Sequence, residues 1–376
     1  MRIRIVGGGP AGLYLAYLLA RRSAGHAIEL VEQNRKGATF GFGVVFSDQA
    51  LGFLKDDDPE THDLIAPEME RWRDLTLNHA GETVRVDGIG FAAIGRRRLL
   101  ELLERRLETV GVVPRYEARF EGEALFDGAD LIVGADGVNS SVRAARDFGT
   151  TVEELANRFA WFGVDRPFDA LTQTFIRTAR GTFNAHHYRF SPTHSTFIVE
   201  ADPTTFAAYG FEEMGEDRSA ALCGEIFAEV LQGRPLLCNK SHWRRFPKLK
   251  NARWSVGNAV LIGDALRTAH FSIGSGTRLA LEDAIALDAA LAEAGEDVAA
   301  ALALFEARRR PAVEKLVAAA DASAAWYEDF PAHMELAPYA FAWSYICRSG
   351  RVDPDRLAKL APGFVSAYRA HAGAEA

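Results

Sequence analysis

The chain has 376 residues and a net charge of −8, and 48% of its residues are hydrophobic and 25% charged. This balance is typical of a globular protein large enough for two domains, and the acidic excess does not favour a nucleic-acid or anionic-membrane partner. The three cysteines are far apart, which argues against a disulfide framework or a zinc site, and we expect no metal. No apolar run reaches the roughly 20 residues of a membrane-spanning helix, and the first residues read as a strand rather than a signal peptide. We therefore expect a cytoplasmic protein.

The first 32 residues have the pattern of a dinucleotide-binding unit. Strands are predicted at 2–6 and 27–31, with a helix over 11–22 between them. The sequence GGGPAG between the first strand and the helix is a G-x-G-x-x-G motif, and an acidic residue follows the second strand twenty positions later. Such glycines permit a tight turn and close approach of a pyrophosphate, while the acid binds ribose hydroxyls. The predicted nucleotide-binding residues are Gly7, Gly9, Pro10, Ala11, Gly12 and Glu32. The alternative is a purely structural turn with a solvated Glu32.

The next segments alternate between loops, strands and helices. FGFGVVFSDQALGFL predicts a glycine-rich loop, a short strand and a helix capped by Ser47 or Asp48. LTLNHAGETVRVDGIG alternates like a hairpin about Ala80 and Gly81, and 96–109 is a charged amphipathic helix.

Two later strands carry acid and glycine pairs to their carboxyl ends. ADLIVGADG ends in Asp136 and Gly137, and NAVLIGDA ends in Gly263 and Asp264. Open α/β sheets bind ligands at this edge, so both pairs are candidate cofactor contacts.

A glycine-rich loop then enters a long helix. Gly274, Ser275 and Gly276 precede a helix that begins at Thr277. A loop leading into a helix N-terminus favours a phosphate or a polarised heterocycle.

The remaining segments predict a second, β-rich domain and a helical tail. Antiparallel strands are expected over 159–200 and a helix over 206–231. Helices are expected from 277 to about 330, interrupted near Gly295 and Pro311, and again to residue 376. The fold class is therefore α/β, mixed with α+β. A Rossmann-like domain is interleaved with a β-sheet domain and followed by C-terminal helices.

GGGPAG, ADLIVGADG and VLIGDALRTAHFSIGSGT, in this order, resemble the FAD-dependent aromatic hydroxylases, the class A flavin monooxygenases of the para-hydroxybenzoate hydroxylase fold. The resemblance implies an FAD-binding domain at 1–70, 96–158 and 251–325. A substrate-binding β-sheet domain is implied at 71–95 and 159–250, and a C-terminal helical segment at 326–376. It also implies that Arg96 contacts the cofactor, that Asp136 and Asp264 bind near its pyrophosphate and ribityl chain, and that the 274–276 amides face the flavin. The implied cofactor residues also include Gly43, Gly137, Gly263, Ser275 and Thr277.

HFSIGSGT, GFGVVFSD and STFIVEAD are similar to the branch acting on aromatic acyl-CoA thioesters, such as salicylyl-CoA 5-hydroxylase and anthraniloyl-CoA monooxygenase. This implies hydroxylation of an electron-rich aromatic acyl-CoA through a flavin C4a-hydroperoxide. O2 and transiently bound NADH or NADPH would be consumed, and a homodimer is a candidate assembly. A carrier-protein thioester in place of CoA, a free indole or phenol, and a non-catalytic nucleotide-binding protein remain alternatives. The W-x-W-x-I-P signature of flavin halogenases is absent. Two positions depart from the family pattern, with Arg267 in place of a common histidine and Phe271 in place of a common proline.

Candidate substrate-facing histidines lie on the flavin loop and on a predicted strand. His270 is the first candidate because its loop is tied to the flavin, and His186 is the second. Strand alternation points either His186 and Tyr188, or His187, into the pocket. A histidine that titrates near neutral pH is suited to accept a phenolic or anilinic proton. A structural role is the alternative for each histidine.

HWRRFPKLKNAR is a basic segment that suits the phosphates of CoA. Its candidate substrate contacts are Arg244, Arg245 and Lys248. The alternative is a solvated basic face.

Overall fold

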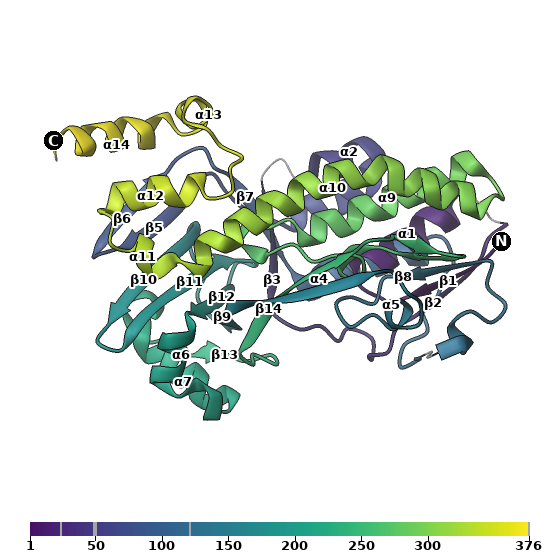
Figure 1. Cartoon of the computed structure of the whole chain (residues 1–376), viewed down its shortest axis with the longest axis horizontal. Helices are drawn as coiled ribbons and strands as arrows, with labels where there is room; N and C mark the ends of the chain where they lie inside the picture. Colours follow the sequence, from purple (N-terminus) through teal and green to yellow (C-terminus); the bar gives the residue numbers. More distant parts are fainter. Residues whose placement is uncertain (23–24, 48–50, 120–121, 375–376) are drawn as a thin grey trace.

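The computed structural model describes residues 1–22, 25–47, 51–119 and 122–374, which form three sheets with helices around them (Figure 1). One sheet has the strand order β15–β16–β8–β1–β2. Its strands are Ser255–Val256, Ala259–Leu261, Leu131–Gly134, Arg2–Val6 and Ala27–Val31, in that order. β1 pairs in parallel with β2 and β8, and β16 pairs in parallel with β8, so these four strands end at one edge. The two predicted acid–glycine pairs and the GGGPAG turn all follow these strand ends.

The helices around this sheet include α1 (Pro10–Arg22), α4 (Arg96–Glu108), α5 (Ser141–Ala144), α9 (Gly276–Ala294) and α10 (Val298–Glu328). α1 packs against both α4 and α9, and α9 packs against α10. Residues 13–19 of α1 are buried around the whole circumference of the helix, which explains why the segment GLYLAYLLA has no polar face.

The sequence predicts two breaks in the helices after residue 277. The break at Gly295 is confirmed, and the break at Pro311 is wrong. Gly295 ends α9 with a φ of +64°, in the left-handed region that glycine tolerates. α10 instead runs unbroken through Pro311. Pro311 is exposed, whereas Phe305, Val313 and Val317 are buried on the packed side of the helix. Burial of that side outweighs the hydrogen bond that proline removes.

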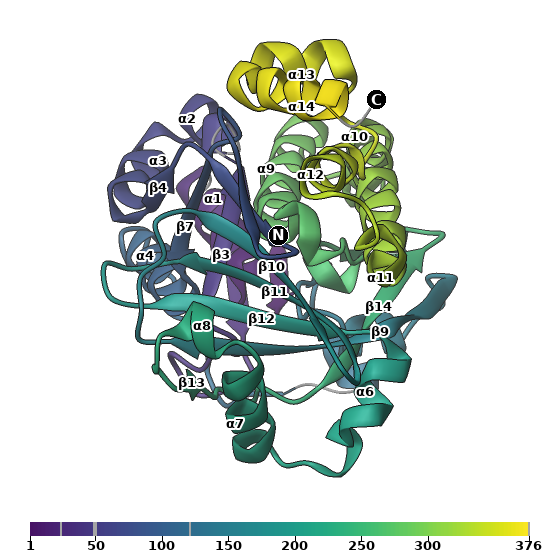
Figure 2. The same ribbon diagram turned by 90° about the vertical axis from the view of Figure 1, so that its left-hand side faces the viewer.

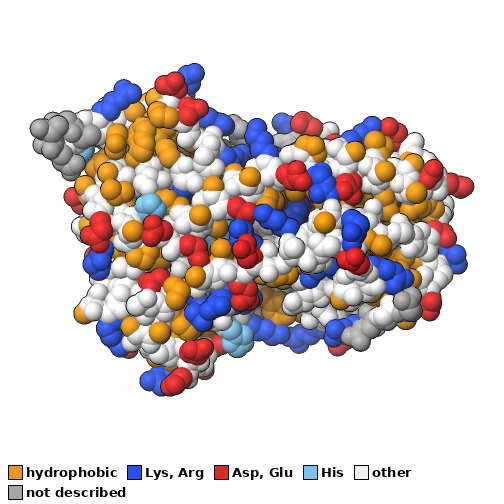
Figure 3. Space-filling view, in the orientation of Figure 1, with side chains coloured by type: hydrophobic (Ala, Val, Ile, Leu, Met, Phe, Trp, Pro, Cys, Tyr) orange, Lys and Arg blue, Asp and Glu red, His pale blue; other side chains and the backbone are white. Residues whose placement is uncertain are grey.

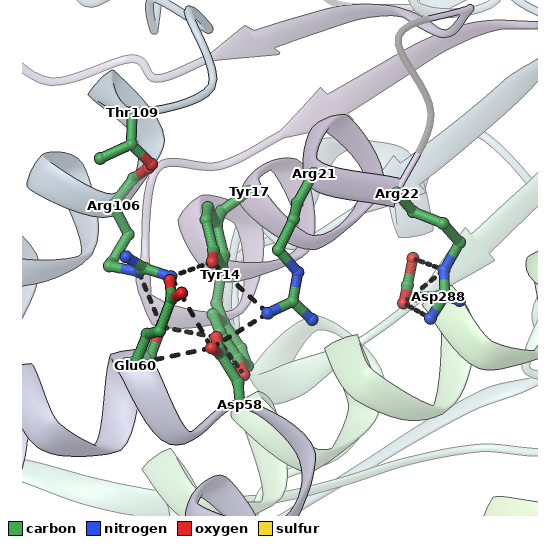
Figure 4. Close-up of polar contacts among 10 residues, drawn as sticks. Tyr14, Tyr17, Arg21, Arg22, Asp58, Glu60, Arg106, Thr109 and Asp288 are labelled. Atoms are coloured by element: carbon green, nitrogen blue, oxygen red, sulfur yellow. Dashed lines mark hydrogen bonds and ion pairs between the residues drawn. The ribbon is translucent and has the colours of Figure 1, made fainter.

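Asp58 fastens α1 to the helices that follow the first strands (Figure 4). Its buried carboxylate accepts hydrogen bonds from Tyr14 Oη at 3.2 Å, Arg21 Nη1 at 3.0 Å and Thr61 Oγ1 at 2.5 Å. Burial and the Asp58 charge raise the pKa of Tyr14 above its usual value. Asp58 is also the N-cap of α3 (Pro59–Ile65), so one side chain joins three segments.

The second sheet has the order β13–β9–β12–β11–β10–β5–β6, and β14 also pairs with β9. Its strands are β13 (Leu236–Leu237), β9 (Thr150–Val164), β12 (Ser195–Ala201), β11 (Gly181–Arg189), β10 (Leu171–Thr178), β5 (Leu75–His79), β6 (Glu82–Val86) and β14 (Arg244–Asn251). The predicted hairpin about Ala80 and Gly81 is confirmed as β5–β6, and the predicted antiparallel strands are β9 to β12. One face packs on α6 (Pro203–Tyr209), η4 (Phe211–Glu213), α7 (Glu216–Ile226) and α8 (Ala228–Leu231).

The opposite face of this sheet meets the C-terminal helices, as Figure 2 shows. These are α11 (Phe330–His333), α12 (Pro338–Cys347), α13 (Pro354–Leu360) and α14 (Pro362–Ala374). Trp326, Tyr327 and Phe330 are buried in this interface, so they form core rather than a substrate surface. Trp326 contacts Tyr327 and Tyr345, and Phe330 contacts Phe175 of β10.

A third sheet, β3–β7–β4, links the other two. Its strands are Gly43–Ser47, Phe91–Gly95 and Glu70–Trp72. The helix expected after β3 is α2 (Gly52–Asp57), followed by α3 and η2 (Ala66–Glu68). Of the two predicted caps, Ser47 is the last residue of β3 and Asp48 lies outside the described residues. Leu51 occupies the N-cap of α2 without a side-chain hydrogen bond.

The surface mixes charges of both signs, as Figure 3 shows for one face. Within the described ranges, no helix has the length and apolar character needed to cross a bilayer. β9 runs through the predicted domain boundary at residues 158 and 159, so the division into interleaved domains stays a prediction.

Candidate functional site

A cleft of about 360 Å³ opens at the carboxyl ends of the parallel strands. We call it the strand-end cleft. It is lined by segments 7–11, 31–35, 37–40, 135–139, 263–264 and 276–277, together with Arg96. Most of these segments follow β1, β2, β8 and β16, whereas 276–277 and Arg96 begin α9 and α4. Parallel pairing of the strands explains why residues distant in sequence meet there.

The GGGPAG turn is shaped by its own packing and leaves room for a ligand. Gly7 has a φ of +111°, and a Cβ there would lie 2.4 Å from the carbonyl oxygen of Ala135. A Cβ on Gly12 would lie 1.9 Å from the carbonyl oxygen of Gly7. A Cβ on Gly9, in contrast, meets no atom of the described residues within 4 Å. The outer glycines are therefore required by the fold, and the middle one faces open space in the cleft.

Glu32 and Asp136 present carboxylates to the cleft with fixed orientation. Glu32 Oε2 accepts from the Gly8 amide at 2.8 Å, and Oε1 accepts from the Asn34 amide at 2.8 Å and from its Nδ2 at 2.7 Å. Asp136 Oδ2 accepts from Ser141 N at 2.6 Å and Oγ at 2.8 Å. Asp136 Oδ1 is buried and has no partner among the described residues. An orphaned acceptor at the cleft wall fits a ligand that brings a donor, such as a hydroxyl group.

A buried ion-pair network underlies the turn at Gly263. Asp283 Oδ2 accepts from the Gly263 amide at 3.0 Å and from Arg267 Nη1 at 2.6 Å, and Asp283 Oδ1 accepts from Arg309 Nε at 3.0 Å. Arg267 Nη1 also donates to the carbonyl of Gly263 at 3.0 Å. The arginine that replaces the family's common histidine therefore ties the turn to α9.

Asp264 follows this turn and opens onto the cleft. Its side chain is exposed to the cleft, whose walls displace part of the surrounding water and so raise its pKa, and the positive charges of Arg96 and Arg267 oppose that rise. Arg96 begins α4 and lines the same cleft, and its guanidinium makes no hydrogen bond to the described part of the chain. The pair presents one carboxylate and one unused cation to a ligand.

The loop between η6 (Phe271–Ile273) and α9 separates this cleft from a second one. Gly276 and Thr277 line the strand-end cleft, whereas Gly274 lines the second cavity. Gly274 has a φ of +61°, and a Cβ there would lie 3.2 Å from Val45, whereas a Cβ on Gly276 meets nothing within 4 Å. Glycine at 274 is therefore needed for backbone conformation, and glycine at 276 leaves space at the helix N-terminus.

The second cavity, of about 100 Å³, lies between the second sheet and α12. We call it the sheet–helix cavity. Its walls are mostly apolar, and its lining residues are Val45, Leu75, Ile89, Phe91, Leu171, Gln173, His186, Ser272, Gly274, Tyr345, Ile346, Arg348 and Val352. A small apolar space with a few polar groups suits an aromatic ring.

The strand alternation left open by the sequence is decided in favour of His186. His186 lines the sheet–helix cavity, and neither of its ring nitrogens has a partner among the described residues. His187 points to the other face, where Nε2 lies 3.0 Å from Thr174 Oγ1 and the ring stacks on Phe197. Burial lowers the pKa of His186 to about 3, with a smaller contribution from Arg348, so the imidazole is neutral.

His270 is buried beside this cavity but does not line it. Its Nδ1 lies 2.8 Å from Ser272 Oγ and accepts from the Ser272 amide at 3.4 Å, which caps η6. Its ring stacks on Phe271. Burial lowers its pKa to about 3 as well. These contacts hold the loop in place.

Four of the predicted cofactor residues do not line the strand-end cleft: Gly12, Gly43, Gly274 and Ser275. Gly43 begins β3, where its carbonyl accepts from Tyr188 Oη at 3.0 Å. A Cβ on Gly43 would lie 2.6 Å from Cβ of Phe190, so sheet packing accounts for this glycine. The other twelve predicted residues line the cleft.

The basic segment lies on β14 and lines neither cavity. Arg245 Nη1 lies 3.7 Å from Glu154, and Lys248 Nζ lies 3.7 Å from both Glu153 and Asp321. Arg244 is different, because it forms no ion pair among the described residues and donates instead to the Lys240 carbonyl at 3.0 Å. Partial desolvation of this exposed side chain and the nearby charge of Arg96 lower its pKa.

Sequence reasoning missed two polar residues of the sheet–helix cavity, Gln173 and Arg348. Arg348 donates to Ser323 Oγ at 3.0 Å, to the Tyr345 carbonyl at 2.6 Å and to the Ser272 carbonyl at 2.9 Å. The sequence around Arg348 does not indicate that its side chain contacts the loop before α9. Gln173 was detectable in principle, because strand alternation on β10 has the same period as on β11.

Comparisons with known proteins show the family to which the chain belongs. A family model described as FAD binding domain matches residues 96–320, and one described as NAD(P)-binding Rossmann-like domain matches 5–42. The chain is 39% identical to a salicyloyl-CoA 5-hydroxylase of a Streptomyces species, covering 93% of this chain and 70% of that protein. It is 40% identical to the 3-hydroxy-4-methyl-anthranilyl-[aryl-carrier protein] 5-monooxygenase of Streptosporangium sibiricum, covering 88% and 90%. A protodeoxyviolaceinate monooxygenase of Chromobacterium violaceum is 33% identical, with 94% and 96% covered. The solved structure of 2-methyl-3-hydroxypyridine-5-carboxylic acid oxygenase shares the fold, with a TM-score of 0.71, 20% identity and 96% of each chain covered.

Proposed function

Because the chain belongs to the FAD-dependent aromatic monooxygenases, we propose that it hydroxylates an electron-rich aromatic acyl-CoA thioester of the salicylyl or anthraniloyl type. NAD(P)H and O2 are the co-substrates. The observation that carries the proposal is the sheet–helix cavity: an apolar, ring-sized space with a neutral His186, separated from the strand-end cleft by a single loop.

The strand-end cleft fits FAD. Gly9 and Gly276 leave open space, the buried Asp136 Oδ1 has no partner among the described residues, and Glu32 keeps lone pairs for ribose hydroxyls. Glu32 would hold the adenosine end, Asp136 and Asp264 the middle, and Arg96 with the 276–277 amides the flavin end. When bound and reduced by NAD(P)H, FAD supplies the activation of O2 for transfer of one oxygen atom to the ring.

The residues of this chain orient the substrate and keep water away. The N-terminus of α9 at Gly276 carries partial positive charge that stabilises an anionic cofactor ring. Val45, Leu171 and Ile346 close the sheet–helix cavity against water. His186 accepts or donates a hydrogen bond at a hydroxyl or amino substituent. Its pKa of about 3 suits a neutral orienting group rather than a base that keeps the proton.

His270 is proposed as a positioning residue. It fixes Ser272, which lines the sheet–helix cavity and borders the loop before α9. His186 is therefore the proposed substrate contact.

The thioester is favoured over a free acid because two relatives near 40% identity are named for thioester substrates. Arg348, the one cation among the described lining residues, already donates to three protein acceptors, which leaves it poorly placed to serve as a dedicated carboxylate partner. A carrier-protein thioester is the second candidate, supported by the 90% coverage of the anthranilyl-[aryl-carrier protein] enzyme.

A panel assay tests the proposal. Purified, FAD-loaded protein is mixed with NADH or NADPH and with aromatic CoA thioesters, the matching carrier-protein thioesters, free acids, phenols and indoles. Nicotinamide oxidation, O2 uptake and product mass are followed. Stoichiometric hydroxylation of a CoA thioester, and not of its free acid, is the expected result. Hydroxylation of free acids or indoles alone contradicts the thioester assignment.

His186→Gln tests the role of the imidazole. We expect kcat/KM to fall about 10- to 100-fold, with product formation falling more than nicotinamide oxidation, because a mispositioned ring no longer captures the oxygen atom. His186→Asn and His270→Gln are the comparisons. A larger loss in His270→Gln than in His186→Gln would reverse the assignment of the two histidines.

A further inference from the structure

Two polar side chains face each other across neighbouring strands in the sheet–helix cavity. Gln173 on β10 pairs directly with His186 on β11, so both project from the same face of the sheet. Both are almost fully buried, with 1% and 4% of their surface exposed, and both line the cavity. Directly opposed residues of an antiparallel pair have Cβ atoms about 5 Å apart. Their polar groups can therefore reach neighbouring atoms of one ligand.

These two side chains have unused hydrogen-bonding groups. Gln173 Oε1 accepts from Asn184 Nδ2 at 3.2 Å, and Gln173 Nε2 has no partner in the described part of the chain. Neither ring nitrogen of His186 has one. The acceptor end of the Gln173 amide is thus occupied, and its donor end remains for a ligand. Asn184 fixes this orientation.

The other polar groups of the cavity are engaged with protein. Arg348 donates to a hydroxyl and two carbonyls. Tyr345 Oη accepts from Tyr327 Oη at 3.2 Å, and Ser272 Oγ lies 2.7 Å from Ser323 Oγ. Recognition of a polar ligand in this cavity therefore depends chiefly on Gln173 and His186.

We propose that Gln173 is a specificity-determining residue that selects aromatic carbonyl compounds with a hydroxyl or amino group on the adjacent ring carbon. Gln173 Nε2 donates to the carbonyl oxygen, and His186 pairs with the neighbouring hydroxyl or amino group. Asn184 acts as a positioning residue through Gln173. This inference rests on the proposed function, because it takes the sheet–helix cavity as the binding place of the substrate ring.

The selection follows from geometry and from the penalty for unpaired groups. Ortho substituents lie side by side, as the two side chains do, whereas para substituents point to opposite ends of the ring. A para isomer that satisfies one side chain leaves the other buried without a partner, which is unfavourable by about one hydrogen bond. We expect the ortho isomer to bind about tenfold more tightly.

Direct binding to the FAD-loaded protein tests this inference without catalysis. The probes are 2-hydroxybenzamide and 4-hydroxybenzamide, and the readout is the change in flavin absorbance. Wild-type protein should prefer the ortho probe by about tenfold, and Gln173→Leu should bind both within about twofold. Equal binding of the two probes by wild type, or an unchanged preference in Gln173→Leu, overturns the inference. If Gln173→Leu does not retain FAD, Gln173→Glu provides the same comparison, because it keeps the size and replaces the donor.

Two further variants separate positioning from general damage. Asn184→Ala should lose most of the ortho preference although it leaves the Gln173 amide in place. Thr172→Val, on β10 next to Gln173 and facing the opposite side, should keep it. An equal loss in both variants contradicts the inference. If no aromatic thioester is hydroxylated but the Gln173-dependent preference persists, the proposed function fails and the recognition pair stands.

Discussion

Replacing Asp283 with asparagine should lower both the stability of the protein and its affinity for FAD. Asp283 is fully buried and accepts hydrogen bonds from the Gly263 amide, from both terminal nitrogens of Arg267 and from Arg309 Nε. The substitution removes the charge that compensates Arg267, of which only 6% is exposed. Removing one partner of a buried ion pair typically destabilises a protein by about 3–5 kcal/mol.

The magnitude converts to a measurable shift. For 376 residues unfolding in one transition, a loss of that size lowers Tm by about 4–6 °C. The same substitution loosens the Gly263 turn that carries Asp264 into the strand-end cleft. We therefore expect FAD to dissociate more readily than from wild type. The assays are thermal unfolding of the FAD-free protein and titration of that protein with FAD.

Glu282→Gln is the matched control, because the neighbouring acid pairs with Arg278 and Arg309 while remaining partly exposed. It should change stability by less than about 1 kcal/mol. Replacing Arg267 and Asp283 together with leucine should recover most of the lost stability, since no unpaired charge remains buried. Asp283→Asn that melts within 1–2 °C of Glu282→Gln, with unchanged FAD affinity, would refute the account of this network.

Three further predictions use the same structure. Gly276→Val should weaken FAD binding by about tenfold or more without lowering the stability of the FAD-free protein. Gly274→Ala, at a φ of +61°, should instead destabilise the FAD-free protein by about 1–2 kcal/mol. Equal effects of the two substitutions on binding and stability would contradict these different roles. Burial raises the pKa of Glu200 to about 8 from the value of 4.5 of a free side chain. The contribution of this carboxyl to stability is therefore complete below pH 4.5 and is lost progressively as pH rises to 8. The free energy of unfolding of the wild type, measured by denaturant titration, should therefore fall by up to about 1.4 kcal/mol per pH unit between pH 5 and 8, and Glu200→Gln should lack this fall. The same pH dependence in variant and wild type would count against this account. Arg244→Ala should raise KM several-fold for a CoA thioester but not for a short thioester without phosphates. Arg245 is ion-paired with Glu154, so Arg245→Ala should change neither KM value. Equal KM values for Arg244→Ala and wild type would argue against a phosphate contact.

The cofactor half of the site could be predicted from sequence because its signals are local. A strand, a glycine turn and a distant acid at fixed spacing specify where Gly7, Gly9 and Glu32 must lie, and parallel pairing brings the ends of β1, β2 and β8 together. Gly43 shows the limit of this reasoning. Its glycine is explained by Phe190, the residue that follows β11, a contact that no spacing in the sequence reveals.

The proposed substrate half could be predicted only in part because its residues depend on tertiary packing. Alternation on one strand narrowed the histidines to His186 or His187, but the side of the sheet that meets α12 decides between them. Arg348 lies at the end of α12, more than seventy residues after the loop that it contacts. Pro311 was misread because a local helix-breaking signal was outweighed by long-range burial of the opposite helix face.

The short stretch from Gly274 to Thr277 borders both cavities, so we expect a ligand bound on one side to change the affinity for a ligand on the other. Thermodynamic linkage then requires that the two effects are equal: the factor by which the aromatic ligand changes the affinity for flavin is the factor by which flavin changes the affinity for the aromatic ligand. Preparations that have shed their flavin would bind such guests with a different apparent affinity, and ligand screens on this protein should record the flavin-to-protein ratio of every sample.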